Sequence, residues 1–165
     1  MSSPTYDQLA ALRPTSRLDV GPEHIDVNGH MNIRHYFDLG GLAIWERCRT
    51  ELGMGEDYIG ERGMSSFTAE QHLAYRDESR EGDRLEAPVL LVDRGDKSLH
   101  VTALIVNHTR QRLACVMESV LVHVDFTTRR AVPFPDDVAA LLDAAVASDR
   151  PAWDLPLSGG LGVRR

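Results

Sequence analysis

The chain has few cysteines, no long apolar run and no excess of basic residues, and each shortage excludes a class of protein. Its two cysteines, Cys48 and Cys115, lie among apolar residues without metal-ligand spacing, so we expect reduced thiols in a core rather than a disulfide framework. No apolar run approaches the roughly 20 residues of a membrane-spanning helix, and the N-terminal residues lack the pattern of a secretory signal. We therefore expect a cytoplasmic protein without a membrane partner.

The charge balance is acidic, with 25 acidic against 18 basic residues and a formal net charge of -7. Proteins that bind nucleic acid normally carry a basic face, so we expect no nucleic-acid partner. A length of 165 residues suits one domain with a single core, and we treat residues 1–165 as one domain.

The first half of the chain predicts one long helix. Asn32 is a plausible N-cap and Gly53 a natural stop, which predicts a helix over 33–52. Apolar residues recur at helical spacing and widen into a broad surface, so the helix should be mostly buried. The residues of this surface are Tyr36, Phe37, Gly41, Leu42, Ile44, Trp45, Cys48 and Leu52. Close packing against a sheet would offset the roughly 1 kcal/mol per glycine that Gly40 and Gly41 cost the helix.

The second half predicts antiparallel strands. Alternation over 66–76 places Phe67, Ala69, Leu73 and Tyr75 on one face and Glu70 on the other. Further ranges are a helical turn at 6–12, an extended segment at 17–26, a hairpin of 84–93 and 99–107, a central strand at 113–126, a last helix over about 136–148 and an irregular tail over 150–165. One long helix followed by such strands is an α+β arrangement in which a sheet wraps around a helix.

The segment from His24 to Asn32 carries the strongest chemical signal. It sets the Asp26 carboxylate, a glycine turn at Gly29 and the start of a helix at Ile33 within a few residues of one another. Such a group suits attack on a carbonyl carbon and stabilisation of its oxygen by a free helix N–H. The residues alone leave two alternatives open: Asp26 could instead hold the turn through its own backbone, and the Ile33 N–H could simply be hydrated.

This arrangement resembles the hotdog-fold acyl-CoA thioesterases of the 4-hydroxybenzoyl-CoA thioesterase group. The resemblance covers roughly 17–135 and rests on the run Asp26-Val27-Asn28-Gly29-His30-Met31-Asn32, which leads through Tyr36 into the helix. Residues 121–125 and 129–135 are similar to a subgroup that includes thioesterases of carnitine and betaine catabolism. The resemblance implies hydrolysis of an acyl-CoA to a free acid and CoA, no cofactor besides the CoA thioester substrate, and a homodimer or homotetramer.

The resemblance also implies roles within the segment. Asp26 would be the nucleophile or the general base, and the backbone N–H of Ile33, which Asn32 leaves free, would bind the thioester oxygen. Gly29 would supply the turn, and His30 would line it, contacting either substrate or a backbone carbonyl. Asn28 and Tyr36 would bind the substrate.

Outside the segment, Glu70 and Glu118 are single acids in apolar strands and need a partner or a site if buried. Glu70 could face the acyl pocket and pair with a cationic acyl group such as that of betainyl-CoA, or form a structural ion pair with Arg76 or another arginine. This hint and the narrower resemblance favour a short or polar acyl group. Basic residues near strand ends could bind the CoA phosphates or be merely solvated. They are Lys97, Arg129 and Arg130.

The histidines and the Asp26 motif raise three other possibilities, which are a metal site, a hydratase and a non-catalytic acyl-CoA binder. His24, His30 and His35 match no compact zinc spacing, so we expect no metal. A hotdog enoyl-CoA hydratase shares an Asp-x-Asn-x-x-His pattern, but here the histidine comes one residue early and Gly29 replaces the usual proline. A non-catalytic acyl-CoA binder would not need Asp26. Thiol release from acyl-CoAs, measured beside hydration of crotonyl-CoA, separates the thioesterase, the hydratase and the binder.

Overall fold

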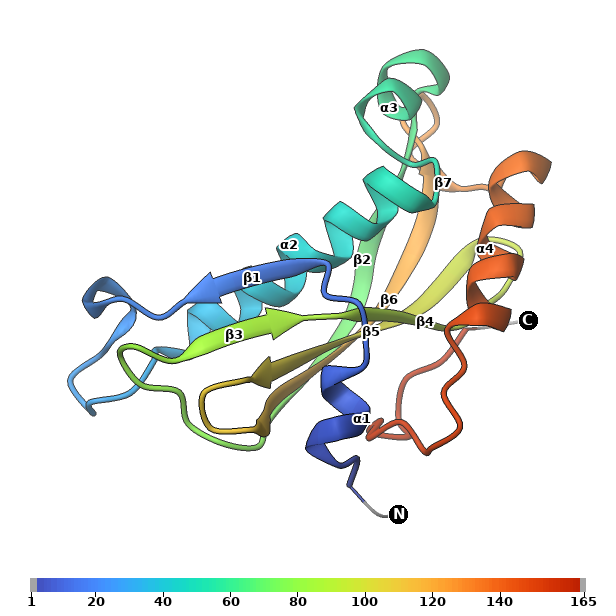
Figure 1. Ribbon diagram of the computed structural model, residues 1–165. Helices are drawn as coiled ribbons and strands as arrows, with labels where there is room; N and C mark the ends of the chain where they lie inside the picture. Colours follow the sequence, from blue (N-terminus) through green and yellow to red (C-terminus); the bar gives the residue numbers. More distant parts are fainter. Residues whose placement is uncertain (1–2, 164–165) are drawn as a thin grey trace.

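A curved antiparallel sheet wraps around one long helix (Figure 1). The computed structural model describes residues 3–163. The sheet has seven strands in the order β1-β3-β5-β6-β2, with β4 also paired to β5 and β7 to β6. The strands are β1 (Ser16–Asp19), β2 (Met64–Tyr75), β3 (Arg84–Ala87), β4 (Val89–Arg94), β5 (Ser98–Asn107), β6 (Arg112–Asp125) and β7 (Arg130–Ala131). The predicted hotdog arrangement is confirmed.

The long helix α2 (Ile33–Glu51) lies against one face of this sheet. Its buried residues are Tyr36, Leu39, Gly40, Ala43, Ile44 and Cys48. The prediction of a mostly buried helix is wrong, because the sheet covers only one side of it. Ile33, Phe37 and Leu42 are about half exposed, at 59%, 48% and 50%.

Strand β2 is long and sits at the edge of the sheet. Its pairing with β6 slips between Thr68 and Glu70, so Ala69 is an extra, bulged residue. A bulge reverses the alternation of side chains, so Leu73 packs in the core beside α2 whereas Phe67 and Glu70 lie on the opposite face. The prediction that Phe67 and Leu73 share a face is therefore wrong.

The other strands follow the sequence pattern with two differences. The predicted strand over 84–93 is divided at Pro88 into β3 and β4, which both pair with β5. The predicted extended segment over 17–26 is only β1, followed by the short helical turn η1 (Pro22–His24). The sequence also gave no indication of helix α3 (Glu56–Arg62), whereas β6 is central as expected.

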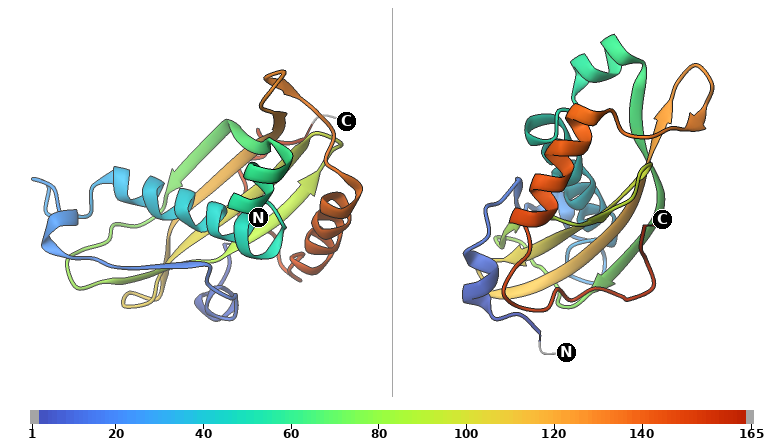
Figure 2. Two further views of the ribbon diagram at one scale, coloured as in Figure 1. Left: turned by 90° about the horizontal axis from the view of Figure 1, so that it is seen from above. Right: turned by 90° about the vertical axis from the view of Figure 1, so that its right-hand side faces the viewer.

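The face of the sheet away from α2, called the outer face below, is partly covered by both ends of the chain. Helix α1 (Tyr6–Ala10) and the segment 150–163 lie below the sheet in Figure 1, and Figure 2 shows them from two further sides. Leu9, Trp153 and Leu155 pack there in a second apolar cluster. Glu118 is buried on this face, as the sequence suggested, and its carboxylate accepts hydrogen bonds from the Ser158 N–H and from His100 Nε2, the latter at 3.3 Å.

Helix α4 (Asp136–Ser148) flanks the sheet and is tied to three elements by arginine-carboxylate pairs. The pairs are Arg62–Asp137, Arg94–Asp143 and Arg47–Asp149, the last with Asp149 at the C-cap of the helix. Cys48 and Cys115 are free and buried, as expected, and burial raises the pKa of each thiol to about 12. Among the described helices, none combines the length and apolarity needed to cross a bilayer.

Candidate active site

A tight loop precedes α2 and holds the motif residues together. Ile25 and Met31 form an isolated bridge, and the Asp26 N–H donates to the His30 carbonyl at 3.1 Å. The Gly29 N–H donates back to the Asp26 carbonyl at 3.0 Å. Gly29 has a φ of +79°, which residues with a side chain adopt only under strain, so glycine is required here for the turn.

The Asp26 carboxylate is held by two donors and is half-buried. Its Oδ1 accepts the Asn28 N–H at 2.8 Å, the turn-holding interaction that the sequence left as an alternative to catalysis. Its Oδ2 faces Asn32 Nδ2 at a longer 3.4 Å. The two roles are compatible, since one oxygen is fixed by the backbone while the other keeps most of its hydrogen-bonding capacity.

The start of α2 leaves one donor unused. Asn32 caps the helix as predicted: its Oδ1 accepts the Arg34 N–H at 3.1 Å, and its carbonyl accepts the His35 N–H at 3.0 Å. Within the described chain the Ile33 N–H donates no hydrogen bond. It lies at the positive end of a 19-residue helix, where an oxyanion is favoured.

The loop after β2 supports this site, and sequence reasoning missed it. The carbonyl of Ser79 accepts the Met31 N–H at 2.7 Å, and Asn107 Nδ2 donates to Ser79 Oγ at 3.3 Å. The side chain of Tyr36 is buried and hydrogen-bonded to Ser79, and burial raises the pKa of Tyr36. Tyr36, for which substrate binding stays a prediction, is thus buried against the loop after β2. No local pattern could have revealed a contact between residues so far apart in sequence.

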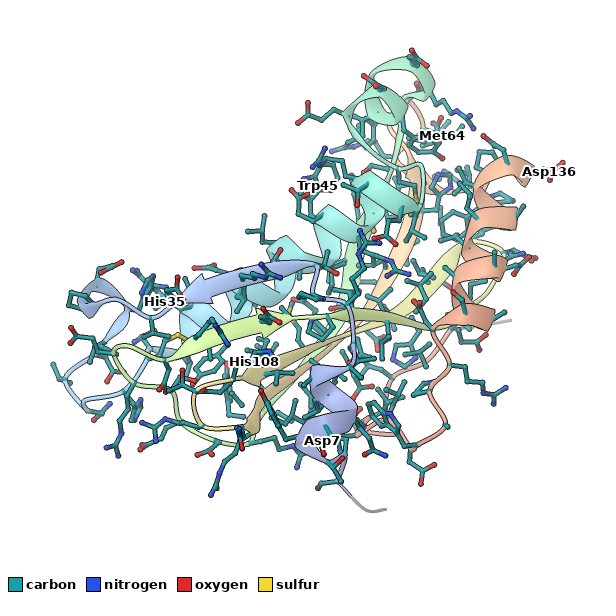
Figure 3. The ribbon with its side chains drawn as sticks, in the orientation of Figure 1. Asp7, His35, Trp45, Met64, His108 and Asp136 are labelled. Atoms are coloured by element: carbon teal, nitrogen blue, oxygen red, sulfur yellow. The ribbon has the colours of Figure 1, made fainter. Side chains whose placement is uncertain are left out.

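Two histidines pack beside the helix start (Figure 3 labels His35). The rings of His24 and His35 meet edge to face, with centroids 4.7 Å apart. Burial lowers the pKa of His35, with smaller contributions from Arg34 and His24. His30 lies on the loop with its Nδ1 3.4 Å from the Met31 carbonyl. Over residues 3–163 no three histidine, cysteine or carboxylate side chains gather as metal ligands would.

The remaining predicted residues lie elsewhere. Glu70 and Lys97 line an open cavity of about 830 Å³ on the outer face, and Glu70 is exposed rather than buried. Among the described residues Glu70 forms no ion pair with Arg76 or with another arginine, so the predicted structural ion pair is wrong. Within one subunit, Glu70 therefore does not share a pocket with Asp26.

Arg129 and Arg130 lie at the far end of the sheet. They follow Asp125, which pairs with Met64 at the start of β2, whereas Tyr75 at the end of β2 packs on Tyr36 near the site. Twelve residues of strand span up to about 40 Å. Arg129 extends over the rings of Phe67 and Phe126 at 5.7 and 6.0 Å.

A narrow cleft of about 180 Å³ separates α2 from β2. On the helix side it is lined by Trp45, Gly41 and Ile44, and on the strand side by hydroxyl groups. The hydroxyl-bearing residues are Ser65, Ser66 and Thr68. Cys48, Met54 and Leu121 complete the lining, so the cleft is an apolar pocket with one indole and one hydroxyl-bearing side.

Comparison with known proteins places this site in a family. A model described as "Thioesterase-like superfamily" matches residues 20–142, which include the loop and all of α2. The chain therefore belongs to the thioesterase-like superfamily, and the prediction of a thioesterase is confirmed.

Two relatives and one solved structure illustrate the similarity. A betainyl-CoA thioesterase of Pseudomonas aeruginosa PAO1 is 32% identical over 155 residues, covering 93% of this chain and 94% of that protein. An L-carnitine dehydrogenase/betainyl-CoA thioesterase of Agrobacterium fabrum is 31% identical over 85% of this chain but only 28% of its own length. A Staphylococcus aureus protein solved in complex with CoA superimposes with a TM-score of 0.81 at 21% identity, covering 93% of this chain and 96% of that one.

Proposed function

We propose that the protein hydrolyses the thioester of an acyl-CoA with a short or polar acyl group, using Asp26 and the Ile33 N–H. The free Ile33 N–H carries this proposal. A donor fixed at a helix start can bind the thioester oxygen and, more strongly, the oxyanion that forms when the carbonyl carbon is attacked. Family membership and the betainyl-CoA thioesterase relatives support the same reaction.

Asp26 would supply the attacking oxygen in one of two ways. As a general base, Asp26 Oδ2 would take a proton from water while the water oxygen bonds to the carbonyl carbon and the CoA thiolate leaves. As a nucleophile, it would displace the thiolate itself to form a mixed anhydride, which water then cleaves. Both routes use Oδ2, since Oδ1 is fixed by the Asn28 N–H.

The cleft between α2 and β2 supports a short or polar acyl group. Its volume of about 180 Å³ is too small for a long fatty chain, and its hydroxyl groups favour polar contacts. The indole of Trp45 is the kind of surface that attracts a quaternary ammonium group, such as that of betaine. Glu70 remains a candidate for charge recognition only if a second subunit brings it near a bound substrate.

A second copy of the chain would complete the site. The unpaired edge of β2 and the exposed apolar residues Ile33, Phe37 and Tyr75, called the α2–β2 patch below, form a surface suited to a symmetric partner. Antiparallel pairing of two β2 edges would bring the far end of one sheet towards Asp26 of the other subunit. That end carries the cleft between α2 and β2 and the basic residues Lys97, Arg129 and Arg130. The basic side chains would then meet the CoA phosphates.

The test is release of free thiol from betainyl-, acetyl- and palmitoyl-CoA, with hydration of crotonyl-CoA measured in parallel. We expect hydrolysis of the short or polar substrates and a loss of at least a hundredfold in kcat for Asp26→Asn, because the amide keeps the shape but cannot act as base or nucleophile. Asp19→Asn, on an exposed position of β1, is the matched control. Preference for palmitoyl-CoA would refute the substrate class, and activity of Asp26→Asn within threefold of wild type would refute the role of Asp26.

A further inference from the structure

We propose that His24 is a positioning residue for this reaction and that its ring must be neutral for the site to be assembled. The inference rests on the proposed function, because its effect is exerted on Asn32 and on the helix start that bears the Ile33 N–H. It rests on two contacts of the imidazole. One joins it to Gly21, which precedes η1, and the other joins it to His35 in the first turn of α2.

The first contact fixes the protonation state of the ring. The Gly21 N–H donates to His24 Nδ1 at 2.8 Å, across the short helical turn η1. A backbone N–H can only donate, so Nδ1 must be an unprotonated acceptor and the neutral ring carries its hydrogen on Nε2. The His24 side chain is only 15% exposed, so water replaces this partner poorly.

The second contact joins the ring to α2. His24 meets the ring of His35, in the first turn of the helix, edge to face. The carbonyl of His24 accepts the Asn32 N–H at 2.9 Å, and Asn32 both caps α2 and faces Asp26 Oδ2. His24 thus clamps η1 to the residue that organises both halves of the proposed site.

Protonation of the His24 ring would change the hydrogen-bond partner of its Nδ1. A protonated ring presents N–H at both nitrogens and repels the Gly21 N–H, while the Glu23 carboxylate, with Oε1 3.6 Å from Nδ1, becomes its acceptor. The Glu23 carboxylate fills the space that a Cβ on Gly21 would take, so it lies beside both partners of the present hydrogen bond. The other charged groups around the pair are Arg34 and Asp38, which act through His35.

Two other histidines lie near the loop, and the variants separate them from His24. Burial lowers the pKa of His35, so His35 takes up its proton at lower pH than an ordinary histidine. His30 lies on the loop itself, with Nδ1 3.4 Å from the Met31 carbonyl. A fall in kcat at acid pH is therefore assigned to His24 only where His24→Asn removes it.

The experiment compares pH profiles of kcat for wild type, His24→Asn, His24→Ala and Glu23→Gln. Asparagine offers an oxygen acceptor that does not titrate, so His24→Asn should keep kcat within about threefold at pH 8 and lose the fall at acid pH. His24→Ala should lower kcat about tenfold at every pH, because a slightly misplaced helix start costs up to about a hundredfold. Glu23→Gln removes the negative charge that favours the protonated ring and should move the acid fall to lower pH. His72→Gln, on the outer face, is the control and should keep the wild-type profile.

A second readout needs no substrate. The amide signal of Gly21 in the ¹H–¹⁵N spectrum should shift in the histidine pH range in wild type and not in His24→Asn. If no acyl-CoA is hydrolysed, the proposed function fails while this titration still tests the clamp. If hydrolysis occurs but His24→Asn keeps the acid fall, or if the Gly21 amide does not titrate, His24 is not a positioning residue.

Discussion

At the scale of single residues, the proposed chemistry depends on one backbone N–H, which a side-chain substitution would ordinarily leave intact. Proline is the exception, since it lacks that hydrogen and is favoured at the first position of a helix. Ile33 occupies this position, and Asn32 before it has φ -60° and ψ 140°, the extended geometry that a following proline requires. The donor can therefore be removed without disturbing the helix.

Ile33→Pro should lower kcat by about a hundredfold to a thousandfold, the effect of removing one oxyanion donor elsewhere, with little change in the free energy of unfolding. Ile33→Ala keeps the N–H and shortens the side chain, so it is the matched control. The measurement is kcat for thiol release together with urea unfolding. Equal activity in the two variants would show that the oxyanion is bound elsewhere.

The sequence predicted residues whose role is set locally and failed where a role depends on distant contacts. Asn32 as cap and Gly29 as turn follow from the conformations that these residue types favour. Ser79 supports the loop from another part of the chain, and no spacing rule reaches it. Phe67 was assigned to the wrong face because Ala69 is bulged, which depends on how β2 pairs with β6.

At the scale of elements, the existence of α2, α4, β5 and β6 was predictable because each has a sustained apolar period. Which face of α2 is buried was not, because that depends on how far the sheet curves around the helix. Helix α3 was missed because seven residues carry too little pattern to distinguish a helix from a loop.

The two adjacent glycines of α2 make a direct test of its packing. A Cβ added at Gly40 would collide with Met117 Sδ, whereas one added at Gly41 meets no atom within 4 Å. Gly41→Ala should raise the free energy of unfolding by up to about 1 kcal/mol through helix propensity. Gly40→Ala should lower it by about 1 kcal/mol because the core must shift. Urea denaturation measures both, and equal effects would contradict the close approach of α2 to β6.

At the scale of the whole molecule, the α2–β2 patch predicts a dimer. Light scattering at micromolar concentration should give at least twice the 18.3 kDa of one chain. Phe37→Glu should shift the protein towards the monomer, since it places a charge in the patch. Leu141→Glu, on α4 and similarly exposed, should not. A wild-type monomer would require each subunit to bind substrate alone.

Arg129 and Arg130 lie far from Asp26 within one subunit, so we expect them to affect substrate binding rather than the chemical step. Replacing Arg129 and Arg130 by alanine should raise KM several-fold and leave kcat nearly unchanged, because contacts to a distant nucleotide stabilise ground and transition states alike. Both side chains are exposed, so the effect should shrink as salt rises. The matched control is Arg13→Ala together with Arg17→Ala, near β1. An unchanged KM at low ionic strength would place the nucleotide elsewhere.

The bulged residue of β2 also constrains how this chain can vary in length. β2 runs from the arginine-bearing end of the molecule to the end where Tyr75 meets Tyr36, and Ala69 lies between its two halves. Loss of Ala69 itself would leave both halves on their present faces, because Thr68 and Glu70 already pair with the adjacent residues Leu121 and Val120. Loss of a residue elsewhere in β2 would turn one part of the strand over. Homologous chains should therefore accept a one-residue gap at the position of Ala69 far more readily than a one-residue gap elsewhere in β2.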